Sequence, residues 1–399
     1  MTLTSSVLDW WDPVTYRHRG AYMYRPAIVL IVLGCQSREG DQGLYTELRD
    51  QGADRYLGAF CPSESINSDT GVIAHEFPAA LDGPMCLYGT DFHTMTHDQG
   101  SEDLVVFLQG GGLCYSELCI AVSSGGAWLP TIDILDTEAT FNPIRDWNQV
   151  YVPYCDGSLF AGDIDIDDDG DGKTDRHHRG LMNLSAAIDV AAQSFPEPRR
   201  VLLAGSSGGG YGTMTAAVLA RWSWPDADLY VFNDAGIGLG IDGDSSFIDQ
   251  IMTELNAHSI IPDSQSDLLA DGHLTPFIGW QLEQDPDLQI SAFSYTWDYV
   301  ISQIYLAVSY ENFESWLRQE TAALQSAHPE RYQYFLPDGS RHTTLLGDPS
   351  GFVDTDSLYY DLIADMLGGM DTTAIDGMSV GSWMEAFVDG SPSWVSMSD

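Results

Sequence analysis

One short segment of the sequence carries residues that could do covalent chemistry. The run LLAGSSGGGYG, from Leu202 to Gly212, begins with apolar residues and ends in two serines and several glycines. Gly205 to Gly209 match G-x-S-x-G, a pattern that presents a serine hydroxyl on a strained strand-to-helix turn. A phosphate loop would need a lysine here, and a dinucleotide turn would need G-x-G-x-x-G from Gly205. The segment therefore predicts that Ser207 is a nucleophile.

A second glycine-rich segment, FLQGGGLC, lies upstream at residues 107–114. Its three glycines follow an apolar run, so that backbone N–H groups could approach a substrate oxyanion without obstruction by side chains. The alternative is that these glycines only form a tight turn. Together with the serine turn, the segment favours an oxyanion-binding loop.

A serine nucleophile needs a base and an orienting carboxylate, which follow in the order serine, acid, histidine when the serine lies on such a turn. His342, in LPDGSRHTTL, follows the last clear apolar run and is the predicted base. Asp298, in ISAFSYTWDYV, is the predicted acid. Asp234, in FNDAG, is the main alternative, because it also ends an apolar run.

Short apolar runs and amphipathic segments alternate along the chain. The runs that predict buried parallel strands occupy residues 103–112, 149–157, 200–207, 228–236, 288–295 and 332–339. Apolar residues at helical spacing predict helices over 180–195, 211–223 and 310–327. The predicted fold class is therefore α/β, with a mostly parallel central sheet flanked by helices. In such a sheet, chemistry gathers at the carboxyl ends of the strands.

The composition limits the partners that this protein could bind. The chain has 399 residues and a net charge of −43, and Lys173 is its only lysine. An exterior this acidic cannot neutralise a nucleic-acid backbone or an anionic membrane, so we expect no nucleic-acid partner. The 44% hydrophobic content is enough for a sizeable core.

The N-terminal region has the pattern of a bacterial lipoprotein signal. Arg25 precedes a short apolar run over 27–33, and a small residue comes before Cys35, the predicted lipidation site. The signal would start at Met23, and the run is too short to span a bilayer. The alternative is a buried strand followed by a free cysteine.

This pattern divides the chain into a leader over 1–34, a polar tether over 35–60 and a single catalytic domain over 61–399. We expect an extracytoplasmic protein, either secreted or held to the cell envelope through a lipid at Cys35. That lipid would be its only membrane contact.

An aspartate-rich insertion over residues 163–178 contains DIDIDDDGDGKTD. It resembles the start of a calcium loop, although His178 stands where a complete EF-hand loop has a bidentate glutamate. The alternative is a bare acidic loop, but its carboxylates would repel one another strongly without a cation. We expect a structural Ca²⁺, and the candidate ligands are Asp165, Asp167, Asp169, Asp171, Asp175 and the backbone carbonyl of Lys173.

Four motifs in order carry a resemblance to a known family. LVVFLQGGGLCYSELC, NPIRDWNQVYVPYCDGSLFAGD, VLLAGSSGGGYG and DGSRHTTL together resemble the pectin acetylesterase/Notum family of serine carboxylesterases, in a bacterial branch. The resemblance extends from about Cys86 to about Leu346. It implies an α/β-hydrolase fold with Ser207 as nucleophile, Asp298 as acid and His342 as base.

The resemblance also implies that the backbones of Gly111, Gly112 and Gly208 donate to the oxyanion. The family needs no catalytic cofactor, and it removes acetyl groups from pectin in some members and a fatty acyl group from a signalling protein in Notum. This sequence differs from Notum at Gly112, where Notum has a tryptophan. The difference leaves the acyl preference open.

Export would place the cysteines in an oxidising compartment, where disulfides persist. Cys114 and Cys119 lie close enough to close a small loop, whereas spacing alone does not pair the others. The family resemblance implies the bridges Cys114–Cys119 and Cys86–Cys155. It would leave Cys61 as an odd thiol.

The sequence as a whole predicts an exported serine carboxylesterase that removes acyl groups, acetyl first, from an extracellular polysaccharide or a similar ester. One alternative is a deacylase for longer acyl chains. Another is a calcium-stabilised, non-catalytic binding or adhesion protein on a hydrolase scaffold.

Overall fold

The computed structural model describes residues 43–399 except for 68–69, 266, 353–354 and 357–359. The predicted leader and the predicted lipidation site, Cys35, lie outside these residues. A ten-stranded sheet forms the centre of the fold. Its strands lie in the order β1 (Glu64–Asn67), β2 (Val72–Phe77), β3 (Phe92–His97), β7 (Asn148–Val152), β4 (Asp103–Leu108), β10 (Arg200–Ser206), β11 (Asp228–Asp234), β12 (Gln289–Phe293), β13 (Tyr332–Leu336) and β16 (Met397–Ser398).

The part of the sheet from β7 to β16 is parallel throughout. All six predicted strands lie in it, so the predicted α/β class with a mostly parallel sheet is confirmed. The strands β1, β2 and β3 add an antiparallel edge. The sequence pattern did not predict this edge, because polar residues such as those in FHTMTH interrupt its apolar character.

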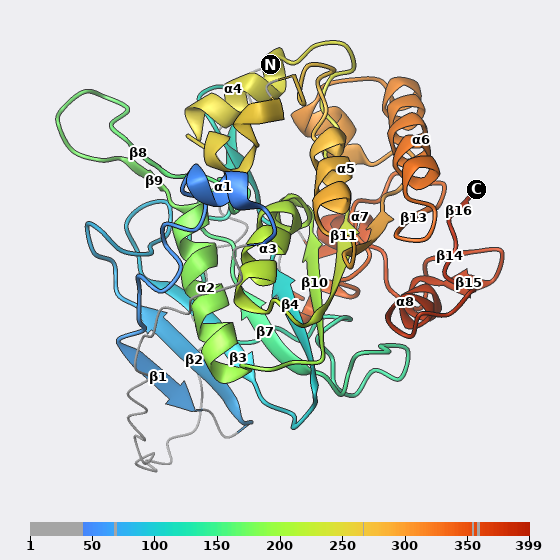
Figure 1. Ribbon diagram of the computed structural model, residues 1–399, viewed down its shortest axis with the longest axis horizontal. Helices are drawn as coiled ribbons and strands as arrows, with labels where there is room; N and C mark the ends of the chain where they lie inside the picture. Colours follow the sequence, from blue (N-terminus) through green and yellow to red (C-terminus); the bar gives the residue numbers. More distant parts are fainter. Residues whose placement is uncertain (1–42, 68–69, 266, 353–354, 357–359) are drawn as a thin grey trace.

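The helices and short hairpins surround this sheet (Figure 1). The three predicted helices are present, and α3 begins three residues earlier than its apolar pattern. The helices are α1 (Thr46–Asp50), α2 (Gly180–Ser194), α3 (Gly208–Ser223), α4 (Ser246–Glu254), α5 (Thr275–Gln284), α6 (Tyr310–Ala327), α7 (Tyr360–Met366) and α8 (Val380–Val388), with a π-helix over Val300–Tyr305. The hairpins pair β5 (Gly112–Cys114) with β6 (Cys119–Ala121), β8 (Ile164–Ile166) with β9 (Arg176–His178), and β14 (Ala374–Ile375) with β15 (Met378–Ser379).

Alternate residues of the central strands serve two separate cores. Val106 of β4 and Leu203 of β10 join the core that α2, α3 and α5 cover. Their neighbours Phe107 and Leu202 face the opposite core, where Trp383 of α8 packs. Successive side chains of a strand point to opposite faces, so a strand buried on both faces needs an unbroken apolar run.

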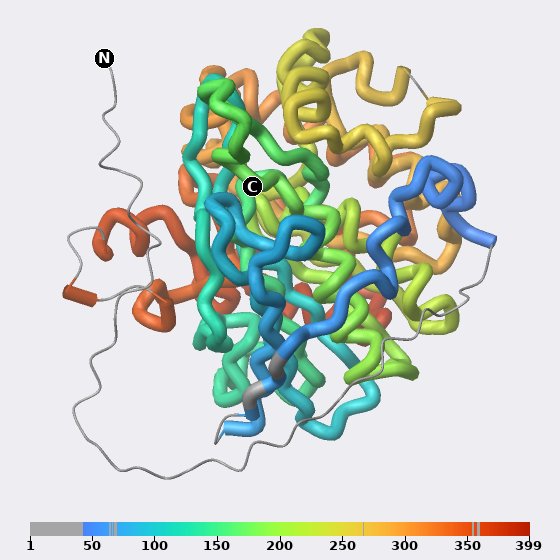
Figure 2. Tube along the Cα trace, turned by 90° about the vertical axis from the view of Figure 1, so that its left-hand side faces the viewer, coloured from blue at the N-terminus to red at the C-terminus, as the bar shows by residue number. Residues whose placement is uncertain are grey.

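The residues just before the antiparallel edge pack against the body of the protein. Tyr45 and Leu48 are buried, and Gln51 donates a hydrogen bond to the carbonyl of Ile261. Figure 2 shows this blue segment running beside the yellow segment near residue 260. The polar tether predicted over 35–60 is therefore wrong from residue 43 onward, because apolar side chains dock this stretch to the domain.

Two disulfides lie where the family resemblance placed them. Cys86 is bonded to Cys155, and Cys114 to Cys119 across the β5–β6 hairpin. The expectation of an odd thiol at Cys61 is wrong, because the described residues include no free cysteine. None of the described helices combines the length and the apolar character needed to cross a bilayer.

Candidate active site

Ser207 lies between the end of β10 and the start of α3. Its backbone has φ 56° and ψ −120°, a conformation that a residue with a side chain rarely adopts. The N–H of Ser207 donates to the carbonyl of Asp234 over 2.7 Å, and its own carbonyl accepts from Tyr211. This strained turn matches the prediction from the G-x-S-x-G pattern.

Two glycines of that pattern are required by close packing. A Cβ at Gly205 would overlap the backbone of Gly209, and a Cβ at Gly209 would overlap the carbonyl of Leu108 in the neighbouring strand. Only glycine allows the helix to start this close to the sheet. The spacing of small residues around Ser207 thus follows from sterics.

His342 and Asp298 form a direct pair, as the sequence predicts. The Nδ1 atom of His342 donates to Oδ2 of Asp298 over 2.7 Å, and the Asp298 side chain is fully buried. The other carboxylate oxygen accepts from the N–H of Ile301, at the start of the π-helix. Asp298 is therefore fixed from two sides and holds the imidazole ring in one orientation.

The alternative acid, Asp234, uses its carboxylate differently. It accepts hydrogen bonds from the Ser206 hydroxyl and from the N–H groups of Thr344 and Leu345. Ser206 immediately precedes Ser207 in the chain, and the other two partners follow His342. The choice of Asp298 over Asp234 as the partner of His342 is thus supported by the observed hydrogen bonds.

The second nitrogen of His342 is available for a reaction partner. Nε2 is buried and has no hydrogen-bond partner among the described residues. Because Asp234 bonds to both Ser206 and the His342 loop, Ser207 and His342 are held at the same edge of the sheet. A buried polar atom without a partner is unusual and is often found at functional sites.

The predicted oxyanion loop lies beside the serine turn. A Cβ built on Gly208 would lie 3.1 Å from the carbonyl oxygen of Gly112 and 3.6 Å from the backbone nitrogen of Gly111. Gly112 has φ +85°, and a side chain there would overlap the backbone of Ile120. A tryptophan at this position, as in Notum, would require a different local backbone.

Tyr154 supports this loop and was not singled out from the sequence. Its buried hydroxyl donates to the carbonyl of Gly112 and accepts from the N–H of Leu159, both over 2.9 Å. Burial raises the pKa of Tyr154 well above its usual value, so the hydroxyl stays protonated and able to donate. Tyr154 lies in the motif VPYCDGSLFAGD, which the sequence analysis noted. The sequence does not distinguish a tyrosine that packs in the core from one that supports a loop by hydrogen bonds.

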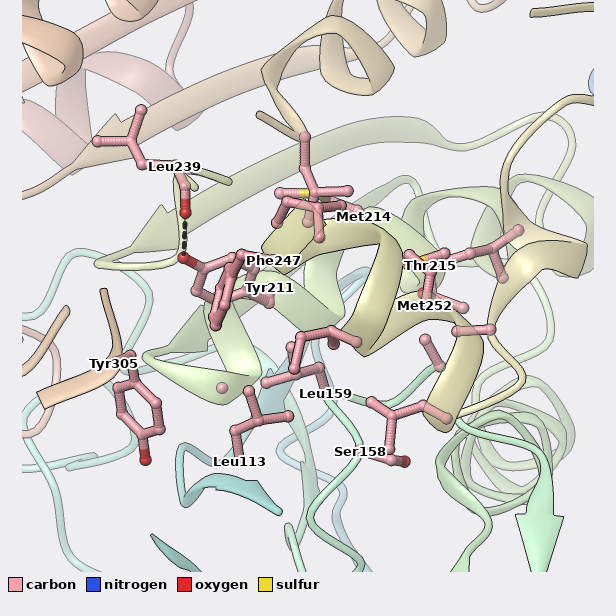
Figure 3. Close-up of a pocket in the computed structure, with 18 of the residues that line it drawn as sticks. Leu113, Ser158, Leu159, Tyr211, Met214, Thr215, Leu239, Phe247, Met252 and Tyr305 are labelled. Atoms are coloured by element: carbon pink, nitrogen blue, oxygen red, sulfur yellow. Dashed lines mark hydrogen bonds between the residues drawn. The ribbon is translucent and has the colours of Figure 1, made fainter. Parts of the chain in front are cut away.

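An apolar cavity opens at Ser207. Its walls come from α3, α4, the π-helix and the glycine hairpin, and Figure 3 shows side chains such as Leu113, Tyr211, Met214, Phe247 and Met252 gathered around it. The cavity follows α3 to Thr215, roughly 12 Å from Ser207 at 1.5 Å per residue.

The acidic insertion forms the β8–β9 hairpin, which projects from the body in Figure 1. Oxygen atoms of Asp167, Asp169 and Asp175 lie within 4.8 Å of one another and could hold a metal ion. The structure therefore brings together three of the predicted calcium ligands.

Two other predicted ligands have different partners. Asp165 lies outside this group of three, and it forms an ion pair with Arg179 at 2.5 Å and bonds to His177. Asp171 accepts from the Lys173 side chain over 2.8 Å, outside the group of three. Burial opposes ionisation of Asp165, but its bonds to Arg179 and His177 outweigh burial and lower its pKa. That carboxylate therefore has its counter-charge within the protein.

A parallel sheet with a strained serine between a strand and a helix defines the α/β-hydrolase class. A family model described as Pectinacetylesterase matches residues 76–266, just under half of the chain. The matched segment includes the glycine loop and Ser207. Asp298 and His342 lie beyond it.

Three curated relatives show similar local matches. Pectin acetylesterase 4 of Arabidopsis thaliana is 28% identical over 40% of this chain and 42% of its own length. Pectin acetylesterase 5 of the same plant is 27% identical over 47% of this chain and 46% of its own length. Palmitoleoyl-protein carboxylesterase notum2 of Xenopus laevis is 30% identical over 29% of this chain and 26% of its own length. The chain thus spans less than half the length of these relatives.

Proposed function

We propose that this protein is an exported serine carboxylesterase that uses Ser207, His342 and Asp298 as a catalytic triad. The observation that carries the proposal is the 2.7 Å bond between His342 and Asp298, at the sheet edge where the strained Ser207 opens onto a cavity. Relatives named as esterases of two kinds support the same reaction class. The bacterial branch stays a prediction.

In this mechanism, Nε2 of His342 accepts the Ser207 proton as Oγ attacks the acyl carbonyl carbon. Asp298 keeps the proton on Nδ1 and stabilises the imidazolium ion. The imidazolium then gives its proton to the leaving alcohol as the C–O bond breaks and an acyl-enzyme forms. Water, deprotonated by His342, attacks the acyl-enzyme and releases the acid and free Ser207.

The orientation of the glycine loop suits an oxyanion site. The carbonyl of Gly111 accepts from the N–H of Val122 over 2.7 Å. Since C=O and N–H point in opposite directions across a trans peptide, the N–H of Gly112 points away from Val122. Together with Gly111 and with Gly208 at the start of α3, it would stabilise the negative oxygen of the tetrahedral intermediate.

The acyl group has two candidate classes. An acetyl group attached to a polysaccharide is supported by the relatives named pectin acetylesterases. A longer acyl chain is supported by the apolar side chains that line the cavity at Ser207 and continue along α3 to Thr215. Each methylene buried in such a cavity stabilises the bound chain by about 0.8 kcal/mol, or roughly fourfold in affinity.

A fluorophosphonate probe tests the triad. We expect the wild type to be labelled and Ser207→Ala to lose labelling, together with about 10⁶-fold in kcat. Ser223→Ala, at the far end of α3, is the matched control and should keep both. Folded wild-type protein that resists the probe would favour the non-catalytic binding protein instead.

A series of aryl esters from acetyl to decanoyl tests the acyl class. If the cavity binds the chain, kcat/KM should rise with length, and Met252→Trp should lower it at least tenfold for long chains while sparing acetyl esters. If kcat/KM stays constant or falls with chain length, and Met252→Trp does not change this, the acetyl class is supported instead.

Two further features are part of the proposal. Disulfides Cys86–Cys155 and Cys114–Cys119 support an extracytoplasmic location, and a lipid anchor at Cys35 stays a prediction outside the described residues. We also propose a structural Ca²⁺ at the group of three aspartates in the β8–β9 hairpin.

A further inference from the structure

We propose that Asp234 is a positioning residue. It holds the turn that carries Ser207 and the loop that carries His342 at the relative positions that catalysis needs. The inference rests on the proposed esterase function. Asp234 is the last residue of β11, next to the end of β10 in the parallel sheet, and its side chain is fully buried. It touches both loops through separate groups.

The backbone of Asp234 holds the serine turn. Its carbonyl accepts from the N–H of Ser207 over 2.7 Å, and its Oδ2 accepts from the hydroxyl of Ser206 over 2.7 Å. Two bonds to adjacent residues fix the plane of the peptide that carries the nucleophile. The strained φ and ψ of Ser207 need such support, because an unsupported turn would relax.

The carboxylate of Asp234 holds the histidine loop at the same time. Its oxygens accept from the N–H of Thr344 over 3.0 and 3.1 Å and from the N–H of Leu345 over 3.0 Å. These residues follow His342 by two and three positions. The side chain thus joins two chain segments that are more than 100 residues apart in sequence.

Every hydrogen-bond partner of this carboxylate is a donor. The side chain bonds to two N–H groups and one hydroxyl, so an ionised carboxylate satisfies all of them. Burial raises the pKa of Asp234 to about 6, although its hydrogen bonds oppose that rise. Asp234 is therefore ionised at pH 8. An asparagine there would turn an NH₂ group toward at least one of these donors.

The consequence for catalysis is geometric. Asp298 already occupies Nδ1 of His342, so Asp234 acts only through the backbone on either side of the reacting groups. A displacement of about 1 Å between nucleophile and base can lower a rate about 100-fold. Loss of Asp234 should therefore lower kcat while substrate binding in the cavity is retained.

The test compares Asp234→Asn, Ser206→Ala and the double variant at pH 8, with an aryl ester substrate. We expect Asp234→Asn to lower kcat by 10- to 100-fold, with KM within about twofold, and to slow fluorophosphonate labelling in parallel. Ser206→Ala should lower kcat by roughly 2- to 5-fold. The double variant should lose no more than Asp234→Asn, since Ser206 acts through the same carboxylate.

Asp189→Asn is the matched control, because Asp189 also accepts a backbone N–H bond but lies on α2. It should keep kcat. If kcat per folded molecule is unchanged in both Asp234→Asn and Ser206→Ala and only thermal stability falls, the inference is overturned. Should Asp234→Asn not fold, Ser206→Ala decides alone. Failure of the esterase proposal would look different, because the wild type itself would then resist labelling.

Discussion

Two groups of carboxylates in this protein differ in what holds them in place. At the sheet edge, Asp234 and Asp298 are fully buried, and each bonds to N–H or O–H donors from other elements. In the β8–β9 hairpin, Asp167, Asp169 and Asp175 are exposed and lie close to one another. Donors from distant segments fix the first group, whereas the second group accepts hydrogen bonds from backbone N–H groups of its own loop.

The difference follows from the cost of desolvation. A buried carboxylate that lacks hydrogen-bond donors strongly destabilises the fold. The donors that surround such a carboxylate in the folded protein therefore indicate its role. Exposed carboxylates keep their water, and salt screens their mutual repulsion. The hydrogen bonds of a buried carboxylate thus indicate its role in the mechanism. The role of an exposed carboxylate has to be found by measuring ligand binding.

Removing the charge of Asp298 should have the largest effect. Asp298→Asn keeps the shape of the side chain but no longer stabilises the correct His342 tautomer, so we expect kcat to fall by about 10⁴-fold. Steady-state kinetics on an aryl ester measure this. Asp169→Asn in the hairpin is the control and should keep wild-type kcat. Similar kcat values in the two variants would break the contrast between the groups.

Tyr154→Phe tests whether a neutral buried group at this edge of the sheet also positions the oxyanion loop for the reaction. The variant leaves the carbonyl of Gly112 and the N–H of Leu159 without their partner. We expect a loss of about 1–3 kcal/mol in transition-state stabilisation, or roughly 5- to 150-fold in kcat/KM. Unchanged kinetics would mean that the oxyanion loop holds its shape without this hydroxyl.

The pH dependence of stability sharpens the contrast further. Burial raises the pKa of Asp156 to about 7, although hydrogen bonds from Ser158 and backbone N–H groups oppose the rise. Because the folded pKa lies above the value of about 3.9 in the unfolded chain, stability from this group is complete below pH 4. It is lost as the pH rises through about 7.

The free energy of unfolding should therefore fall between pH 5 and pH 8, and Asp156→Asn should remove about 2–3 kcal/mol of that fall. Urea titrations at the two pH values measure it. Exposed Asp169→Asn should keep the wild-type dependence. Equal slopes for all three proteins would show that burial of Asp156 has no such effect.

Calcium should have the smallest effect. With a dissociation constant of about 10⁻⁴ to 10⁻³ M, typical of extracellular modules, 1 mM Ca²⁺ would stabilise the fold by about 0.4–1.4 kcal/mol. A thermal melt with calcium or with chelator measures the shift, and Asp169→Asn should abolish it. If the wild type melts identically in both, the hairpin does not bind calcium in the folded state.

Local signals in the sequence were enough for much of the fold. Unbroken apolar runs predicted the six central strands, because strands covered on both faces require them. The antiparallel edge was missed because its strands mix polar and apolar residues, and α4 and α5 were not predicted. The segment after residue 43 was assigned to a tether because it follows the polar residues QSREGDQG after Cys35.

For the site, the residues around Ser207 already specify the serine turn, since the close approach of helix and sheet admits only glycine at Gly205 and Gly209. It also placed His342 after the last strand. The folded protein was needed to show that Asp298 bonds to the imidazole of His342 while Asp234 joins two loops. Both aspartates follow strands, and the donors that distinguish them come from segments far away in the chain. Steric restrictions on a turn depend on residues that are close in sequence, whereas the partner of a buried charge depends on how distant segments pack.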